Sequence, residues 1–204
     1  IGELATQAGF PPGAFNIVTG LGEEAGDVLI NHSGVHHLSF TGSTEVGALV
    51  QQAAAKNAVP VTLELGGKSP QVVFSDADLD KALPFLVNAS IQNCGQTCSA
   101  ASRVLVEQSI YENLTLRLAE KFTELQAGPA FRDLDCGPLI SPEQQVRLGK
   151  YLEQAKADGL NFAAEGKIVY DAPSGGNYVK PMLIRDVPPD HVVAQVELFG
   201  PVFA

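Results

Sequence analysis

The chain has 204 residues, of which 45% are hydrophobic and 18% charged, a composition typical of a globular protein that can bury a core. The formal net charge is −10 and the 13 lysines and arginines are spread thinly, which argues against a nucleic-acid-binding surface. No apolar run approaches the ~20 residues that a membrane span needs, and three cysteines are too few for a disulfide framework. We therefore expect a protein of a reducing compartment, with the cytoplasm as the default location.

Helical and extended patterns alternate over residues 1–66. In chain order we expect a helix over 1–9, a strand over 14–18, a helix over 23–31, a strand over 36–40, a helix over 45–56 and a strand over 61–65. Alternation of this kind, with short turns, is typical of a parallel sheet covered by helices. Three strands are too few for a complete dinucleotide-binding fold, so this part is expected to be the end of one.

A second unit is expected over residues 67–204. Its elements are a strand over 71–74, a helix over 79–94, a strand over 103–106, helices over 109–125 and 142–158, extended segments over 161–170 and 178–184, and a strand-like run over 192–196. Apolar residues on one stripe make the 109–125 helix amphipathic. Pro84 is expected either to kink its helix or to lie in the first turn of a second one.

Cys98 lies in a segment rich in glycine, serine and alanine, between a helical run and a strand. Small neighbours allow backbone or a ligand to approach the sulfur, so Cys98 is a candidate covalent nucleophile. Cys94 and Cys98, with no histidine nearby, do not make a tetrahedral zinc site, and Cys136 stands in a loop without a partner pattern. We expect no metal. The four scattered histidines leave a cysteine–histidine hydrolase open.

Glu64 stands at the end of the 61–65 strand and is followed at once by Gly66 and Gly67. In an open parallel sheet, a carboxylate at the C-terminal end of a strand faces the crevice where ligands bind. If it is partly desolvated there, Glu64 can act as a general base. The alternative is an ordinary surface glutamate at a strand end.

Two turns of small residues follow expected strands and precede helices. Gly42 and Ser43 belong to the turn 41–44, and Gly22 closes the turn that begins at Gly20. Backbone N–H groups at a helix N-terminus attract anions, so each turn could hold a phosphate group. Serine also caps helices routinely, and this plainer reading of Ser43 stays open.

Four segments together resemble the NAD(P)-dependent aldehyde dehydrogenase superfamily: Phe40–Gly47, Leu63–Pro70, Asn93–Arg103 and Glu197–Val202. Pro11–Val18 and Gly20–Gly22 are also similar to that family, and the resemblance covers nearly the whole chain. It implies an α/β chain in which 1–66 is the end of a Rossmann-like, parallel-sheet cofactor domain. It further implies that 67–204 is most of an α/β catalytic domain, incomplete at its C-terminus.

The resemblance implies a role for each matching residue. Cys98 would add to the aldehyde carbonyl, its backbone N–H would help to hold the oxyanion, and a thioester would remain after hydride transfer. Glu64 would activate the water that hydrolyses this thioester. The cofactor, NAD or NADP, would be bound by Gly22, Gly42, Ser43, Leu65, Gly66, Glu197 and Phe199. Glu197 and Phe199 resemble the pair that holds the nicotinamide ribose, whereas Arg103 resembles a structural residue.

The chain lacks the family's N-terminal and C-terminal parts, among them the asparagine that completes the oxyanion hole and the lysine on the adenosine ribose. We therefore expect an internal piece that is inactive alone, from a whole protein that oxidises a small aldehyde as a homo-oligomer, a dimer or a tetramer. Three alternatives remain: a relative that passes the thioester to CoA, a non-catalytic binding or structural member, and a cysteine hydrolase without cofactor. Glu64, as a water-activating base, favours hydrolysis over CoA transfer.

Overall fold

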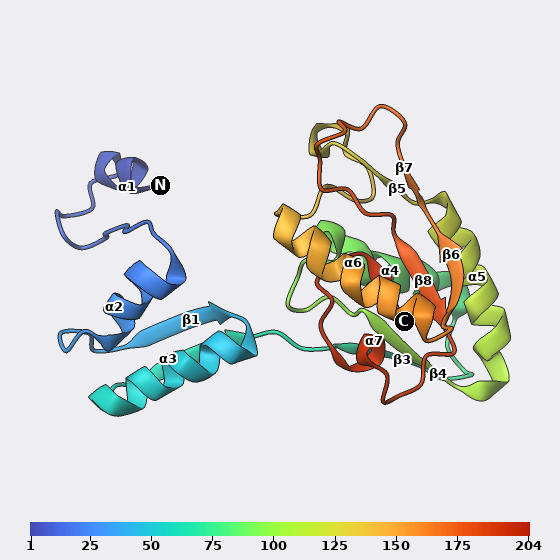
Figure 1. Ribbon diagram of the computed structural model, residues 1–204, viewed down its shortest axis with the longest axis horizontal. Coiled ribbons are helices and arrows are strands. Elements are labelled where there is room, and N and C mark those ends of the chain that lie inside the picture. The colour runs from blue at the N-terminus through green and yellow to red at the C-terminus, as the bar shows by residue number, and fades with distance from the viewer. The chain divides into compact units, whose positions relative to one another are not determined.

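The computed structural model describes residues 1–204, which divide into two compact units, Ile1–Leu65 and Gly66–Ala204 (Figure 1). Both units combine helices with parallel strand pairs, so the predicted α/β class is confirmed. Each unit has its own hydrophobic cluster. No helix has the length and the apolar content that crossing a membrane requires.

The first unit is built around one parallel strand pair. Its elements are α1 (Gly2–Gln7), the π-helical turn η1 (Gly22–Gly26), α2 (Asp27–Asn31), β1 (Leu38–Gly42), α3 (Thr44–Asn57) and β2 (Val61–Leu65). β1 and β2 pair in parallel from Leu38 opposite Val61 to Gly42 opposite Leu65. α3 is the crossover between them, and it ends at Ala58, which adopts a left-handed conformation with φ of 54°. This is the strand–helix–strand unit that the sequence predicts.

The strand predicted over residues 14–18 does not form. Residues 11–15 form turns, and no ladder of hydrogen bonds includes the residues that follow. A strand exists only where a neighbour supplies hydrogen-bond partners, and β1 and β2 pair with each other alone. Phe15, Ile17 and Val18 are accordingly exposed.

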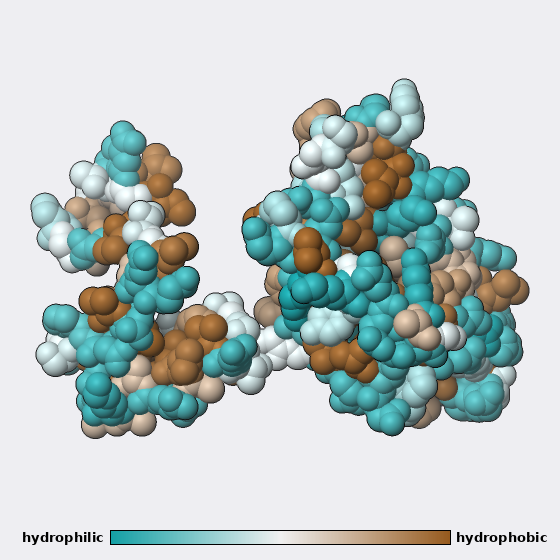
Figure 2. Space-filling model, viewed as in Figure 1, coloured by the Kyte–Doolittle hydropathy of each residue, from teal (hydrophilic) through white to brown (hydrophobic).

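The first unit buries little of its apolar surface. Its fully buried cluster consists of Leu38, Val50 and Ala54, and many large apolar side chains outside this cluster face solvent. Figure 2 shows hydrophobic residues at the surface of this unit. Contiguous exposed apolar surface of this kind marks places where another segment or chain packs.

The second unit holds three groups of strands and its own helices. Its helices are α4 (Leu79–Ile91), α5 (Tyr111–Glu124), α6 (Pro142–Ala157) and α7 (Val192–Gln195), with short 3-10 turns η2 (Gln92–Gly95), η3 (Gln108–Ile110) and η4 (Ala130–Arg132). Its strands are β3 (Pro70–Val73), β4 (Arg103–Val106), β5 (Gln126–Ala127), β6 (Asn161–Glu165), β7 (Lys167–Ile168), β8 (Met182–Arg185) and β9 (Val202–Phe203).

The strands of the second unit are joined at Ala204. β3 pairs in parallel with β4, while β8 pairs with β6 in antiparallel and with β9 in parallel orientation. Ala204, directly after β9, donates to the carbonyl of Ser102 at 3.0 Å and accepts from the N–H of Val104 at 2.8 Å. The last residue therefore connects β9 to β4, and thus the β3–β4 pair to the three-stranded sheet.

Large side chains fill the core of the second unit. Leu114, Leu118 and Phe122 form the inner face of α5 and are almost fully buried, as the amphipathic pattern predicts. Phe122 stacks on Phe203 of β9, with ring centroids 5.8 Å apart. This packing fixes β9, and with it the segment that precedes β9, on the core.

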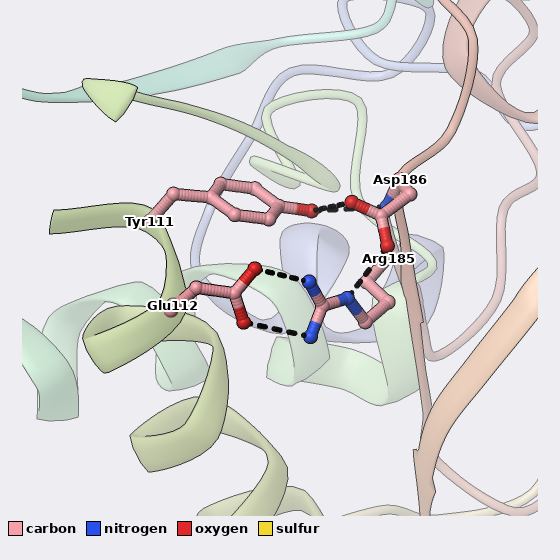
Figure 3. Close-up of polar contacts among 4 residues, drawn as sticks. All are labelled: Tyr111, Glu112, Arg185 and Asp186. Carbon is pink, nitrogen blue, oxygen red and sulfur yellow. Dashed lines mark hydrogen bonds and ion pairs between the residues drawn. The ribbon is translucent and has the colours of Figure 1, made fainter. Parts of the chain in front are cut away.

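Four residues fasten the end of β8 to the start of α5 (Figure 3). Arg185 forms two hydrogen bonds to the Glu112 carboxylate, at 2.7 and 3.2 Å, and a third to Asp186 at 2.7 Å. The Tyr111 hydroxyl donates to Asp186 at 2.8 Å and accepts from its backbone N–H at 3.0 Å. The Arg185 guanidinium also lies over the Tyr111 ring, 5.3 Å from its centroid. Because Arg185 makes both ion pairs at once, this cluster is a network rather than an isolated surface pair.

One prediction for the second unit is wrong. The run 192–196 forms the short helix α7 instead of a strand. The His191 side chain caps it by accepting from the Val193 N–H at 3.1 Å and also contacts Asp158 at 3.1 Å. These contacts outweigh the preference of valine for strands. Of the two placements expected for Pro84, the structure has the one inside its helix, α4.

Candidate active site

Cys98 is presented on an exposed turn. It follows η2 and lies in the turn that the Ala100 N–H closes on the Thr97 carbonyl at 2.9 Å. Cys98 is exposed, whereas Cys94 and Cys136 are buried, and all three thiols are free. The backbone N–H of Cys98 donates to no group of the chain. An accessible thiol beside a free N–H has the two parts needed to attack a carbonyl and to stabilise the resulting oxyanion.

A run of left-handed residues turns the chain toward Cys98. Asn93, Cys94 and Gly95 have φ of 51°, 57° and 69°. For the two non-glycine residues this conformation costs roughly 1–2 kcal/mol each. The Asn93 side chain donates to the Gln96 carbonyl at 2.9 Å, which offsets part of that cost. Strain of this kind persists where surrounding contacts impose it, and it is common at functional sites.

Gln96 anchors the cysteine loop to the chain near residue 140. Its side-chain oxygen accepts from the Ile140 N–H at 2.8 Å. Its amide nitrogen lies 3.2 Å from the Asn93 carbonyl and 3.3 Å from the Pro138 carbonyl. The side chain thus supports the left-handed turn from within and ties it to a segment more than forty residues away in sequence.

Gly95 places the cysteine loop directly on the segment Glu197–Pro201. A Cβ at Gly95 would lie 2.1 Å from the carbonyl oxygen of Gly200. Only glycine allows this approach, and only glycine adopts its positive φ without strain. The loop that carries Cys98 and the segment that carries Glu197 are therefore in backbone contact.

Two side chains of α6 hold the carbonyl groups of the Glu197–Pro201 segment. Gln144 donates to the carbonyls of Leu198 and Phe199 at 2.9 and 2.8 Å. Arg147, one helical turn further, donates to the carbonyl of Glu197 at 3.0 Å. Phe199 adopts a left-handed conformation with φ of 55°, and these bonds fix it. Sequence reasoning did not identify Gln144 or Arg147, because the contacts join residues about fifty positions apart.

The Glu197 carboxylate lies against Gly66. A Cβ at Gly66 would be 1.9 Å from one carboxylate oxygen, Oε2. The other oxygen, Oε1, is buried and has no hydrogen-bond partner. Burial raises the pKa of the Glu197 carboxyl, while the Gly67 N–H, Arg147 and Lys68 act in the opposite direction. The missing side chain at Gly66 lets the carboxylate lie against the main chain, and its oxygen without a partner has the capacity to accept a hydrogen bond from a ligand.

Lys68 is a buried cation beside the same carboxylate. Its side chain is 9% exposed, and its Nζ has no hydrogen-bond partner. Burial, reinforced by Arg103, lowers the pKa of Lys68 to about 8, and Glu197 works against this shift. The Leu63–Pro70 motif includes Lys68, but the sequence alone assigned it no role, because nothing local shows that a lysine will be buried.

The remaining predicted site residues belong to the first unit. Glu64 is exposed near the end of β2, opposite Thr41, and Gly42 pairs with Leu65. The Leu65 side chain packs against Gly47 of α3. Ser43 caps α3, since its Oγ accepts from the Val46 N–H at 3.2 Å. Gly22 begins η1 and lines a cavity of about 730 Å³ between η1 and α2.

The structure thus brings some of the predicted residues together. Gly66 meets Glu197, and the loop of Cys98 contacts the segment that includes Phe199. Glu64, Leu65, Gly42, Ser43 and Gly22 are in the other unit. The second unit by itself therefore contains the nucleophile candidate and three of the seven predicted cofactor residues, Gly66, Glu197 and Phe199.

Comparisons with known proteins agree on one family. The model of the aldehyde dehydrogenase family matches residues 1–204. Aldehyde dehydrogenase 1A1 of Bos taurus is 42% identical over 99% of this chain and 40% of its own length. A Burkholderia cenocepacia protein assigned as an aldehyde dehydrogenase is 60% identical, with a TM-score of 0.97 over 99% of this chain and 42% of its own. The betaine aldehyde dehydrogenase of Staphylococcus aureus, solved with NAD+, is 36% identical with a TM-score of 0.93. Its match covers 99% of this chain and 40% of that enzyme, so the chain spans about two fifths of its relatives' length.

Proposed function

Because this chain belongs to the aldehyde dehydrogenase family, we propose that the whole protein oxidises an aldehyde to a carboxylic acid with NAD or NADP. The observation that carries the proposal is Cys98, exposed on a strained loop in backbone contact with the Glu197–Pro201 segment. Relatives named as aldehyde dehydrogenases, and one solved with NAD+, support the reaction and the cofactor.

In the proposed reaction the Cys98 sulfur adds to the aldehyde carbonyl as a thiolate. The carbonyl π electrons move to oxygen, and the N–H of Cys98 stabilises the oxyanion. A nicotinamide cofactor bound here would supply the acceptor for the hydride of the former aldehyde carbon, and Cys98 would then carry a thioester. Water, deprotonated by Glu64, then attacks the thioester, and the thiolate leaves as the carboxylic acid forms. Electrons balance, because the two taken from the aldehyde leave as the hydride.

The residues around Glu197 fit the ribose of such a cofactor. A carboxylate oxygen that is buried without a partner accepts hydrogen bonds from vicinal hydroxyls well. Gly66 leaves the space beside this carboxylate free of a side chain. We assign Glu197, Phe199 and Gly66 to the nicotinamide end of the cofactor and Gly22, Gly42 and Ser43 to its pyrophosphate, with Leu65 beside the nicotinamide.

We further propose that residues 1–66 contribute to cofactor binding and residues 67–204 to catalysis. The exposed apolar surface of the first unit supports a whole protein in which further segments cover it. On this proposal the 204-residue chain alone is inactive or nearly so, and the whole protein works as a cytoplasmic homo-oligomer.

The test is the formation of reduced nicotinamide by the whole protein with acetaldehyde, propanal and benzaldehyde. We expect activity with NAD+ or NADP+ that needs no CoA, its near-complete loss in Cys98→Ala, and little change in the matched control Ser99→Ala, also exposed on the turn. Activity that depends on CoA would favour the acylating alternative. Hydrolysis of esters without any cofactor would favour a cysteine hydrolase, and robust turnover by the 204-residue chain would contradict its proposed inactivity.

A further inference from the structure

Three buried polar atoms of the second unit have no hydrogen-bond partner: Lys68 Nζ, Arg103 Nε and Glu197 Oε1. They are not independent of one another, because Arg103 and Glu197 both act electrostatically on the Lys68 ammonium. Buried polar atoms are nearly always paired in native proteins, so a group of orphaned atoms indicates that something mobile or bound satisfies them.

The chain path brings Lys68 to Glu197. Gly66 touches the Glu197 carboxylate, and Lys68 follows two residues later, directly before β3. Arg103 begins β4 opposite Pro70 of β3, and it donates to the Ala194 carbonyl at 3.2 Å. The start of β4 therefore lies beside the start of β3, and the Arg103 charge acts on the nearby Lys68 ammonium.

We propose that Lys68 is a positioning residue, which holds the Glu197 carboxylate ionised and oriented for the cofactor. This inference rests on the proposed function, in which Glu197 meets the nicotinamide ribose. Lys68 acts through the charge of Glu197 and does not touch the reacting atoms. Its buried ammonium is the positive charge nearest in sequence to the Gly66–Glu197 contact, and burial keeps that charge from being screened by solvent.

We expect the Lys68 ammonium to cost the fold stability rather than to add to it, which separates positioning from a structural role. An ammonium without a partner in a desolvated place favours its neutral form, as the lowered pKa of Lys68 shows. Arg147 also acts on Glu197, but it donates to the backbone carbonyl and so fixes the main chain. The carboxylate is stabilised in its charged form by the Gly67 N–H, by the Arg147 charge and by the Lys68 charge, and of the two cations only Lys68 is buried.

The experiment compares Lys68→Met and Lys68→Arg in the whole protein, with Lys81→Met as control, since the Lys81 side chain is 84% exposed. Steady-state kinetics give kcat and the KM for NAD+, and calorimetric titration gives the Kd for NAD+. For Lys68→Met we expect KM and Kd to rise about tenfold, kcat to change less than about threefold, and the melting temperature not to fall. Lys68→Arg, which keeps the charge, is expected to recover most of the affinity, and Lys81→Met to behave as the unsubstituted protein.

Unchanged cofactor affinity in Lys68→Met overturns the inference. A merely structural role would instead lower kcat and the melting temperature together, and Lys68→Arg would not restore either, which also overturns it. Failure of the proposed function has a different signature: the unsubstituted protein would then bind NAD+ without oxidising any aldehyde, and the Kd values of the variants would still decide the role of Lys68. A protein that does not bind NAD+ at all would contradict both.

Discussion

The Glu197 carboxylate rests on Gly66 so closely that a Cβ at Gly66 would lie 1.9 Å from Oε2. Gly66→Ala must therefore displace the carboxylate. We expect the KM for NAD+ to rise at least tenfold, which corresponds to about 1.4 kcal/mol. Gly67→Ala is the matched control, because a Cβ there meets nothing within 4 Å. Steady-state kinetics give the KM for NAD+ of both variants in the whole protein. Equal KM values for the two variants would refute the role of this contact.

The backbone contact between Gly95 and Gly200 gives a prediction about stability. Gly95→Ala places a methyl group 2.1 Å from the Gly200 oxygen at a position with φ of +69°. We expect the free energy of unfolding to fall by roughly 2 kcal/mol or more. Gly149→Ala in α6, where a Cβ meets nothing within 4 Å, is expected to raise it by roughly 0.5–1 kcal/mol. Denaturant titration gives the free energy of unfolding of both variants. An unchanged value in Gly95→Ala would contradict the close contact with Gly200.

The lowered pKa of Lys68 predicts a pH dependence of stability. In the folded state the pKa is about 8, against 10.5 for an unburied lysine, so the unfolded state binds more protons between these values. Below pH 8 the ammonium therefore costs the folded state about 3 kcal/mol, and the cost disappears as pH rises toward 10.5. Lys68→Met should accordingly be more stable than the unsubstituted protein near neutral pH, and this advantage should shrink above pH 8. A pH-independent difference would show that Lys68 is solvated.

The three thiols should differ in reactivity. Cys98 is exposed, whereas Cys94 and Cys136 are 2% and 1% exposed. A hydrogen bond with Cys94, together with burial, also raises the pKa of Cys136, so its reactive thiolate is scarce. Iodoacetamide followed by mass spectrometry should modify Cys98 well before the other two, and all three equally in denaturant. Equal rates without denaturant would mean that the loop is not formed as described.

Much of the fold follows from local sequence patterns. The strands 61–65 and 103–106 form as predicted, because each is rich in β-branched or other apolar residues and lies between clear turn signals. The predicted strand 14–18 fails since no partner strand lies beside it, and 192–196 forms a helix because His191 caps it. Both failures arise from context that a local pattern does not contain.

The site likewise contains residues that the sequence indicates and residues that it does not. Cys98 stands out locally because its neighbours are small, whereas Glu197 was predicted only through the resemblance of its segment to the family. Lys68 does not stand out, because its burial depends on strands and loops distant in sequence. Gln144 is equally hidden, although its two hydrogen bonds hold the carbonyls of Leu198 and Phe199. The residues that the sequence did not reveal, Lys68, Gln144 and Arg147, are those whose contacts join segments far apart in the chain.

Ala204 ties β9 to β4 by two backbone hydrogen bonds, and Pro201 accepts a third from Met182 at 2.9 Å. The Glu197–Pro201 segment directly precedes β9, which these hydrogen bonds hold between β4 and β8. The amide protons in these hydrogen bonds, above all that of Ala204, can exchange with solvent only when the bonds between the strands break. Slower exchange at Ala204 on adding NAD+ would therefore make this one amide a spectroscopic reporter of cofactor binding, read without any turnover.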